Sequence, residues 1–201
     1  MPAPIRFYID FVSTYSYLAV HRIDDLAARY GRTVDWQVVS LGHIFQDLKV
    51  TPPPFIPARL KYNTTDLLRS AEFAGLTFKL PETFPFDAKV SRYPFWSLKA
   101  KDEKLARDFA LAVMRRAFGE GGKIGTAAEI ADACAPLGLS VADIEAAAAN
   151  PSAKRAVVEA MDRARADGMI GAPFMVLDGE TFWGADRLDH LERRLSSAAQ
   201  S

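Results

Sequence analysis

Cysteine is nearly absent from this chain, whose 201 residues include only Cys134. A single thiol excludes an internal disulfide, an internal redox dithiol and a zinc site built from several cysteines. The three histidines, His21, His43 and His190, lie far apart and lack the spacing of metal ligands. We therefore expect no metal site, and no thiol–disulfide exchange by the chain's own cysteines.

Excess charge and long apolar segments are missing as well. The 25 basic side chains balance the 25 acidic ones, so no net field favours nucleic acid or an anionic membrane. Apolar runs such as residues 109–114 fall far short of the roughly 20 residues that span a bilayer, and the N-terminus lacks the apolar region of a secretory signal. We expect a cytoplasmic protein that binds neither nucleic acid nor membrane, in which local groups hold any anionic ligand.

Both ends of the chain have clear β patterns. Alternating apolar residues predict strands over 5–11 and 34–38, and three- and four-residue apolar spacing predicts one helix over 13–30, ending before Gly31. Such a strand–helix–strand unit is normally parallel. Near the C-terminus, runs over 174–177 and 180–183 flank Asp178-Gly179, a strong signal for an antiparallel hairpin. A short helix should follow, with Asp186 as a candidate N-cap.

The middle of the chain is predicted to be helical. Capping-box spacing at Thr126 and Ser140, and Asn150 before a proline, mark helix starts. The expected helices are 65–74, 101–117, 127–137, 142–149 and 151–166. The proline-bearing stretches 52–54 and 80–85 are expected to be stiff loops.

Three residues are candidates for chemistry, and each has a structural alternative. Ser13 stands where the first strand meets the first helix, and a helix N-terminus stabilises an anion such as a thiolate, but Ser13 is also a good N-cap. Pro173 is either a cis proline that shapes a site or the opener of an edge strand. Asp186 either binds a ligand or caps the last helix.

Taken together, these features resemble a known family. The segments 7–19, 168–174 and 182–188 carry the resemblance, which is to the thioredoxin fold of the DsbA-like and kappa-class glutathione transferase families, and most of all to the 2-hydroxychromene-2-carboxylate isomerases. It implies an α/β thioredoxin-like fold (βαβ…ββα) with a helical domain inserted between its two halves. The thioredoxin-like domain would comprise residues 1–45 and 168–201, and the inserted helical domain residues 46–167.

The resemblance implies glutathione as the cofactor and source of the thiol. Ser13 and Ser16 stand where thioredoxin-like oxidoreductases have Cys-x-x-Cys. Ser13 matches the catalytic hydroxyl that donates a hydrogen bond to the sulfur of glutathione. Thr14 stands where proline is usual, and Val50 where kappa enzymes have asparagine. The aromatic stretch with Tyr62, Arg92, Tyr93 and Trp96 either lines a substrate pocket or, as we favour, belongs to the core or an interface.

Further glutathione contacts follow from the same resemblance. Asp186 matches the residue that holds the γ-glutamyl amino group, and Ala185 replaces the neighbouring serine of kappa enzymes. Ala172, before Pro173, matches the residue whose backbone pairs with the cysteinyl part. Arg59 matches the basic residue that meets a carboxylate of glutathione, with Lys61 as the alternative.

The function implied by the resemblance is a glutathione-dependent isomerase acting on an aromatic substrate of the hydroxychromene-carboxylate or benzylidenepyruvate type. Two alternatives stay open: a kappa-like glutathione S-transferase or peroxidase, and a non-catalytic thioredoxin-fold binding module. The resemblance also implies a homodimer. Cys134 lies in the expected insertion, and we expect it to be dispensable.

Overall fold

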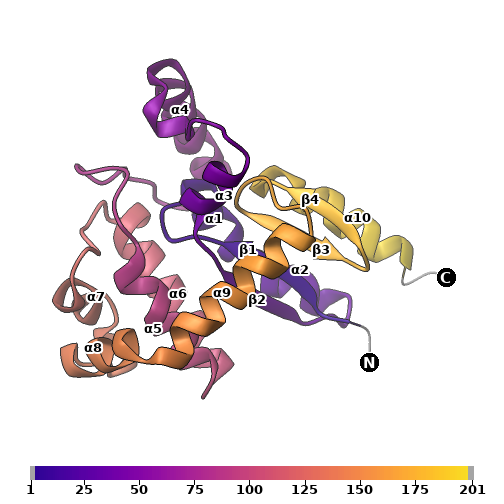
Figure 1. Ribbon diagram of the computed structural model, residues 1–201. Coiled ribbons are helices and arrows are strands. Elements are labelled where there is room, and N and C mark those ends of the chain that lie inside the picture. The colour runs from indigo at the N-terminus through magenta and orange to yellow at the C-terminus, as the bar shows by residue number, and fades with distance from the viewer. Residues whose placement is uncertain (1–2, 199–201) are drawn as a thin grey trace.

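The structure, a computed structural model, describes residues 3–198, and its centre is a four-stranded sheet in the order β2-β1-β3-β4. Strand β1 (Ile5–Ile9) pairs parallel with β2 (Val34–Val38) and antiparallel with β3 (Phe174–Leu177), which pairs antiparallel with β4 (Glu180–Trp183). Figure 1 shows this sheet between helices. The four predicted strands are therefore confirmed, except that β1 ends at Ile9.

The β3–β4 hairpin turns at the Asp-Gly pair that predicted it. Asp178 and Gly179 have φ of 50° and 89°, so both adopt the left-handed conformation. A turn with two positive φ values has the twist that suits antiparallel strands, and aspartate and glycine tolerate it well. This turn fixes the register in which Phe174 lies opposite Trp183.

The segment after β1 forms two helices, α1 (Thr14–Val20) and α2 (Ile23–Arg29), so the single helix predicted over 13–30 is wrong. The amide of Arg22 bonds to Ala19 O, three residues back, which tightens the chain and ends α1. Apolar spacing continues across this break because both helices bury apolar side chains, among them Leu18 in α1 and Ile23 and Leu26 in α2. Gly31 follows α2 with a φ of 66°, as a helix-ending glycine should.

Eight further α-helices complete the described residues: α3 (Leu41–Asp47), α4 (Pro57–Phe73), α5 (Lys89–Lys99), α6 (Glu103–Met114), α7 (Ala127–Ala133), α8 (Val141–Ala149), α9 (Pro151–Ala166) and α10 (Leu188–Ala198). Short turns of other helix types lie at η1 (Pro53–Phe55), η2 (Arg115–Gly119), η3 (Ala135–Leu137) and η4 (Ala185–Arg187). The caps predicted at Thr126, Ser140 and Asn150 are all present.

The middle of the chain also contains helices that the sequence pattern did not predict. Neither α3 nor α5 was expected, and α5 contains Pro94, a residue that normally argues against a helix interior. Helix α4 begins eight residues earlier than predicted, at Pro57, where a proline suits the first turn. The predicted helices 101–117 and 127–137 end in the π-helical turn η2 and the 3-10 turn η3.

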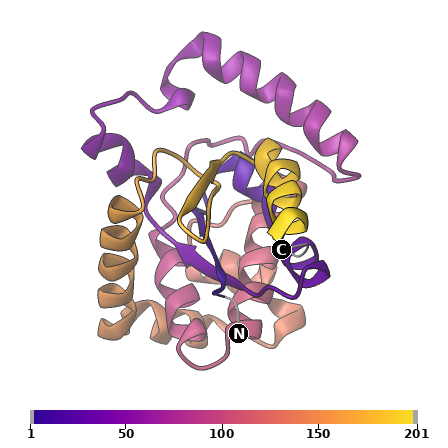
Figure 2. The same cartoon turned by 90° about the vertical axis from the view of Figure 1, so that its right-hand side faces the viewer.

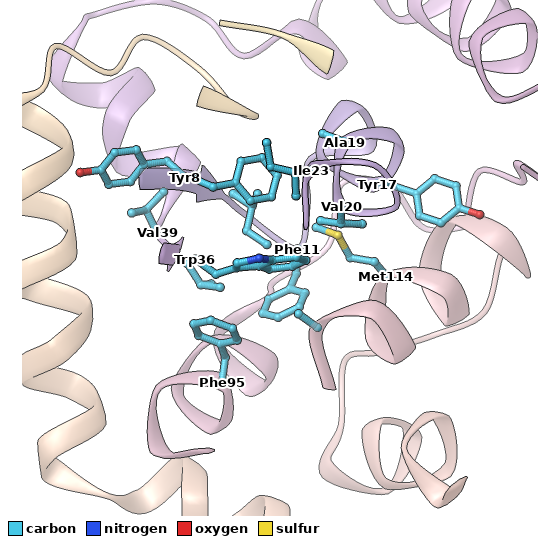
Figure 3. Close-up of a cluster of buried hydrophobic side chains, with 14 of the residues drawn as sticks. Tyr8, Phe11, Tyr17, Ala19, Val20, Ile23, Trp36, Val39, Phe95 and Met114 are labelled. Carbon is cyan, nitrogen blue, oxygen red and sulfur yellow. The ribbon is translucent and has the colours of Figure 1, made fainter. Parts of the chain in front are cut away.

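Helices cover both faces of the sheet. Helices α2 and α10 pack together on one side, and α5 and α9 pack together on the other, where both contact β2 (Figures 1 and 2). Between the layers Trp36 meets Phe7 edge-on at 5.3 Å. Figure 3 shows Trp36 together with Phe95 from α5, which is fully buried. Among the described residues no helix is long and apolar enough to cross a membrane.

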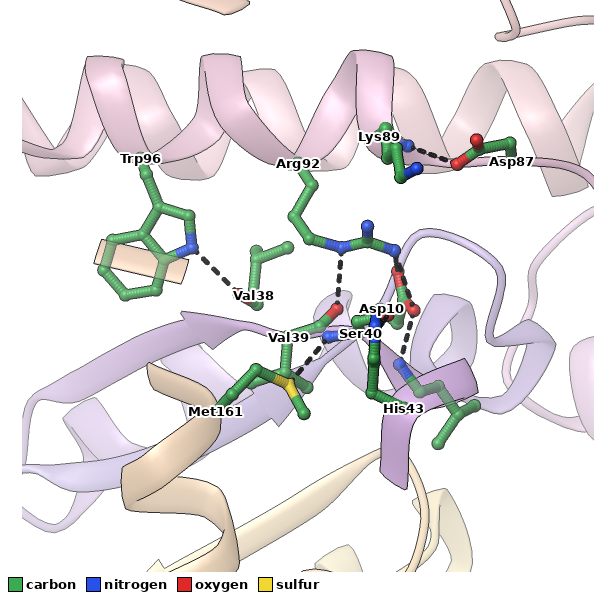
Figure 4. Close-up of polar contacts among 11 residues, drawn as sticks. Asp10, Val38, Val39, Ser40, His43, Asp87, Lys89, Arg92, Trp96 and Met161 are labelled. Atoms are coloured by element: carbon green, nitrogen blue, oxygen red, sulfur yellow. Dashed lines mark hydrogen bonds and ion pairs between the residues drawn. The ribbon is translucent and has the colours of Figure 1, made fainter. Parts of the chain in front are cut away.

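Helix α5 is fixed to the ends of β1 and β2 by polar contacts (Figure 4). Arg92 donates to Val39 O at 3.0 Å and pairs with Asp10 at 3.0 Å, and Trp96 Nε1 donates to Val38 O at 2.8 Å. Asp10 also accepts the amide of Leu41 at 2.8 Å. Both α1 and α3 start beside this buried cluster, which therefore sets their positions at one end of the sheet. The domain boundaries expected at 45/46 and 167/168 stay a prediction.

Candidate functional site

A cleft of about 1110 Å³ lies between α4 and the end of the sheet where α1 begins. Figure 2 shows α4 crossing the top of the molecule, above the β3–β4 hairpin and α10. Six of the seven residues predicted for the site line this cleft: Ser13, Thr14, Arg59, Ala172, Ala185 and Asp186. Residues 13 and 186 are far apart in the chain, so the fold itself assembles the site.

Ser13 caps a helix and also lines the cleft. It is the N-cap of α1, with its Oγ accepting the amide of Ser16 at 3.1 Å. The same hydroxyl donates to Ala172 O at 3.0 Å and lines the cleft, although the residue is only 5% exposed. A serine hydroxyl has one proton to donate. In this structure that proton is directed at Ala172 O, at the wall of the cleft.

The Ala172–Pro173 peptide bond is cis, which was one of the two alternatives predicted for Pro173. Pro173 does not line the cleft, but it presents its neighbour Ala172 to it, and its carbonyl accepts the amide of Gly184 at 3.0 Å. A Cβ at Gly171 would overlap the indole of Trp183, which packs over this backbone. The glycine thus allows an aromatic ring to form part of the cleft wall.

Asp186 is not the N-cap of a helix, so that alternative is wrong. It lies within η4, whose N-cap is Gly184 with a φ of 114°. The turn places the Asp186 side chain at the cleft, where its Oδ2 accepts from Arg187 Nη2 at 2.8 Å. This conformation depends on a glycine, because φ near 114° is strained for other residues. The carboxylate is mostly exposed and available to a ligand cation.

Helix α4 contributes two of the basic residues of the cleft, Arg59 and Arg69. Arg59 lines it and Lys61 does not, so of the two residues considered for a carboxylate contact only Arg59 is in place. Arg69, which was not predicted, lines the cleft from the same helix. Val50 lies outside the lining, at the position where kappa enzymes have asparagine.

A hydrogen bond between α1 and α4 was not predicted from the sequence. The hydroxyl of Tyr15 donates to Asp66 Oδ2 at 2.8 Å, and both residues line the cleft. Burial, together with the hydrogen bond to this carboxylate, raises the pKa of Tyr15 above its ordinary value. The phenol is therefore neutral and holds α4 against α1. No local pattern reports a contact between residues 51 positions apart.

The aromatic stretch considered as a substrate pocket has a structural role instead. Arg92 and Trp96 are buried in the contacts to β1 and β2, and Tyr93 packs against the core. Tyr62 is 62% exposed, and none of the four lines the cleft. Core and surface positions therefore account for these residues.

The described residues hold no cluster of side chains suited to a metal ion. Cys134 is fully buried and lies outside the cleft lining, and burial raises the pKa of its thiol to about 12. The cleft thus contains a hydroxyl, carboxylates and guanidinium groups but no thiol of the chain.

Comparison with known proteins agrees with this architecture. The model of the DSBA-like thioredoxin domain family matches residues 4–196. A 2-hydroxychromene-2-carboxylate isomerase from Sphingobium xenophagum is 29% identical over 201 residues, covering 97% of this chain and 99% of the relative. Glutathione s-transferase kappa 2 from Caenorhabditis elegans is 25% identical over 197 residues, covering 92% of this chain and 88% of the relative.

A solved structure of a 2-hydroxychromene-2-carboxylate isomerase superposes with a TM-score of 0.87 at 26% identity. The superposition covers 98% of this chain and 97% of the solved one. The similarity therefore extends over both halves of the sheet and over the helices between them.

Proposed function

The chain belongs to the family of DSBA-like thioredoxin domains, and from that membership we propose that it is a glutathione-dependent isomerase of aromatic substrates of the hydroxychromene-carboxylate or benzylidenepyruvate type. Relatives named 2-hydroxychromene-2-carboxylate isomerase match nearly its whole length. The observation that carries the proposal is the Ser13 hydroxyl, 3.0 Å from Ala172 O at the wall of a large cleft in which the chain places no thiol of its own.

The residues of the cleft suit glutathione, a zwitterionic tripeptide thiol. Asp186 offers a carboxylate for its amino group and Arg59 a guanidinium for a carboxylate. Ala172 presents a backbone carbonyl beside the cis Pro173, where a peptide amide can pair with it. Thr14 and Ala185 line the cleft next to Ser13 and Asp186, and their backbone is available for further contacts.

Ser13 and Ala172 together would hold the cysteinyl part of the ligand, through a hydroxyl donor and a carbonyl acceptor that lie side by side at the wall of the cleft. Glutathione held there would supply a thiolate nucleophile for reversible addition to an unsaturated carbon of the substrate. The Ser13 hydroxyl turns its proton from Ala172 O to the sulfur, and a ligand amide then satisfies Ala172 O. The exchange leaves no buried acceptor unpaired, and a donated hydrogen bond lowers the pKa of a thiol from its usual value of about 8.5.

Titrating the protein with glutathione tests the proposal. We expect the ultraviolet absorbance of a thiolate to rise with saturation at neutral pH, the melting temperature to rise, and 2-hydroxychromene-2-carboxylate to isomerise only when glutathione is present. A melting temperature that glutathione does not move, with neither thiolate nor isomerisation, would overturn the proposal and favour a non-catalytic binding module.

A kappa-like glutathione transferase or peroxidase is the second candidate, because a relative named as a kappa glutathione transferase also matches most of the chain. The same thiolate would serve that reaction. The two activities differ in their products: a transferase consumes glutathione as it forms a conjugate, a peroxidase oxidises it, and an isomerase leaves its concentration unchanged. Measuring free glutathione before and after turnover therefore separates them.

We also propose that the protein works as a cytoplasmic homodimer. Exposed side chains of α4 that lie outside the cleft support an interface, and they include Leu68, which is 52% exposed, and Tyr62, which is 62% exposed. Sedimentation equilibrium tests the assembly, with a mass twice that of the 22.1 kDa chain as the expected result. A single species at the mass of one chain would contradict it.

A further inference from the structure

Four arginines line the cleft, and they differ in how they are paired. Arg22 forms an ion pair with Asp189, and Arg187 forms one with Asp186, each at 2.8 Å. Arg59 and Arg69, both on α4, make no ion pair or side-chain hydrogen bond with any residue in the range 3–198. The cleft therefore offers two unpaired cations, and glutathione binding as proposed above uses Arg59 but leaves Arg69 without a role.

Arg69 is too far from Arg59 to act on the same carboxylate. Ten residues separate the two along α4, which corresponds to about 15 Å of helix axis at 1.5 Å per residue. The cleft, at about 1110 Å³, also exceeds the roughly 300–1000 Å³ of ordinary small-molecule pockets. Its size and the separation of its cations fit two ligands bound at the same time.

Two acidic residues lie at ion-pair spacing from Arg69 on α4, and neither pairs with it. Asp66 precedes Arg69 by three residues and Glu72 follows it by three. The Oδ2 of Asp66 instead accepts the Tyr15 hydroxyl at 2.8 Å. The Tyr15 contact thus keeps α4 in place and leaves the guanidinium of Arg69 free for an incoming anion.

The cleft also offers apolar surface for an aromatic ring. Phe73 follows Arg69 by four residues on α4, so the two side chains share one side of the helix, and both line the cleft. Leu80, Phe84 and Pro85 line it as well. A guanidinium binds a carboxylate through two parallel hydrogen bonds, while apolar side chains bury a ring.

We propose that Arg69 is the residue that selects an aromatic carboxylate as the second ligand of the cleft, by pairing with its carboxylate while the apolar side chains receive its ring. The inference rests on the proposed function and names the group that recognises the substrate. It predicts that charge on the ligand, in addition to its ring, decides binding.

Binding of two inert probes tests this assignment. 3-Phenylpropanoate and 3-phenylpropanamide share ring, chain and shape but differ in charge. By calorimetry, with and without saturating glutathione, we expect the wild-type protein to bind the acid at least tenfold more tightly than the amide. Arg69→Gln should bring the two affinities within twofold of each other, and Arg69→Lys should retain part of the preference.

Lys61→Gln provides the matched control, because Lys61 is exposed on the same helix but lies outside the cleft. It should leave the preference for the acid unchanged. Equal binding of the two probes by the wild-type protein, or a preference that survives Arg69→Gln, would overturn the proposal. So would a loss of glutathione affinity in Arg69→Gln with acid binding unchanged, since Arg69 would then bind glutathione's second carboxylate.

The same data separate this inference from the proposed function. If glutathione raises no thiolate absorbance but the preference for the acid depends on Arg69, the isomerase proposal fails and the carboxylate site stands. If the thiolate forms but the wild-type protein shows no preference for the acid, the isomerase proposal stands and the carboxylate site fails.

Discussion

The hydroxyl of Ser13 lies 3.0 Å from the carbonyl oxygen of Ala172, although the two residues are 159 positions apart in the chain. The contact joins the start of α1 to the residue before cis Pro173, so the two ends of the chain meet at the wall of the cleft. Because the same hydroxyl caps α1, a change at Ser13 acts on stability and on the cleft together.

Ser13→Ala should therefore have two separable effects. Loss of the N-cap is expected to lower the free energy of unfolding by about 1 kcal/mol, measured by urea titration. Loss of the hydroxyl should abolish the thiolate absorbance that glutathione produces, because this hydroxyl is the donor proposed for the sulfur. Ser13→Thr keeps a hydroxyl and should retain part of the capping stability and part of the thiolate absorbance.

Ser140→Ala is the control for the first effect. Ser140 caps α8 through the same kind of hydrogen bond and lies outside the cleft. It should lose about as much stability as Ser13→Ala while glutathione still produces the full thiolate signal. If Ser13→Ala also kept that signal, Ser13 would be a cap and nothing more.

The Tyr15–Asp66 hydrogen bond is predicted to hold α4 over the cleft. Tyr15→Phe removes the donor and leaves the packing of the ring, so we expect a loss of about 1 kcal/mol and faster hydrogen exchange of the α4 amides. Tyr62→Phe, on the exposed side of α4, should change neither the stability nor the hydrogen exchange of the α4 amides. Unaltered exchange in Tyr15→Phe would show that the packing of α4 alone keeps it in position.

The buried pair of Asp10 and Arg92 should be far more sensitive than surface pairs. Arg92→Met leaves the Asp10 carboxylate buried without its cation, which is expected to cost about 3–5 kcal/mol in unfolding experiments. Asp10→Asn added to that variant removes the stranded charge and should recover part of the loss.

Arg165→Met is the comparison for this prediction, because Arg165 pairs with Asp47 where both side chains are largely exposed. It should change stability by about 0–1 kcal/mol. Equal losses for the two arginine variants would show that the Asp10–Arg92 contact does not act as a buried ion pair.

Local patterns predicted the parts of the fold that local physics decides. Alternation located β1 and β2, the runs flanking Asp178-Gly179 located the hairpin of β3 and β4, and serine and threonine caps located the starts of α7 and α8. Helix α5 was missed because Pro94 argues against a helix, while the burial of Arg92 and Trp96 against β1 and β2 favours one. That burial depends on tertiary packing, which a local pattern does not contain.

The site was predictable to a similar extent. Resemblance located Ser13, Arg59, Ala172 and Asp186, and the cleft brings them together. It did not locate Tyr15 as a partner of Asp66, or Arg69 as a lining residue, because both depend on which side of α4 faces α1. The turn at Gly184 likewise decides whether Asp186 caps a helix or faces the cleft, and its φ of 114° is a property of the folded chain.

Cys134 is the one thiol of the chain. Burial raises the pKa of this thiol to about 12, so the thiol stays protonated near neutral pH. An aromatic disulfide reagent, which reacts with the thiolate, should therefore modify the folded protein only as fast as it unfolds.

Cys134→Ala should leave glutathione-dependent isomerisation intact, because Cys134 lies outside the cleft. Any thiolate absorbance near neutral pH in that variant must then come from bound glutathione. Loss of isomerisation in a folded Cys134→Ala protein would instead place the nucleophile on the chain and contradict the borrowed thiol.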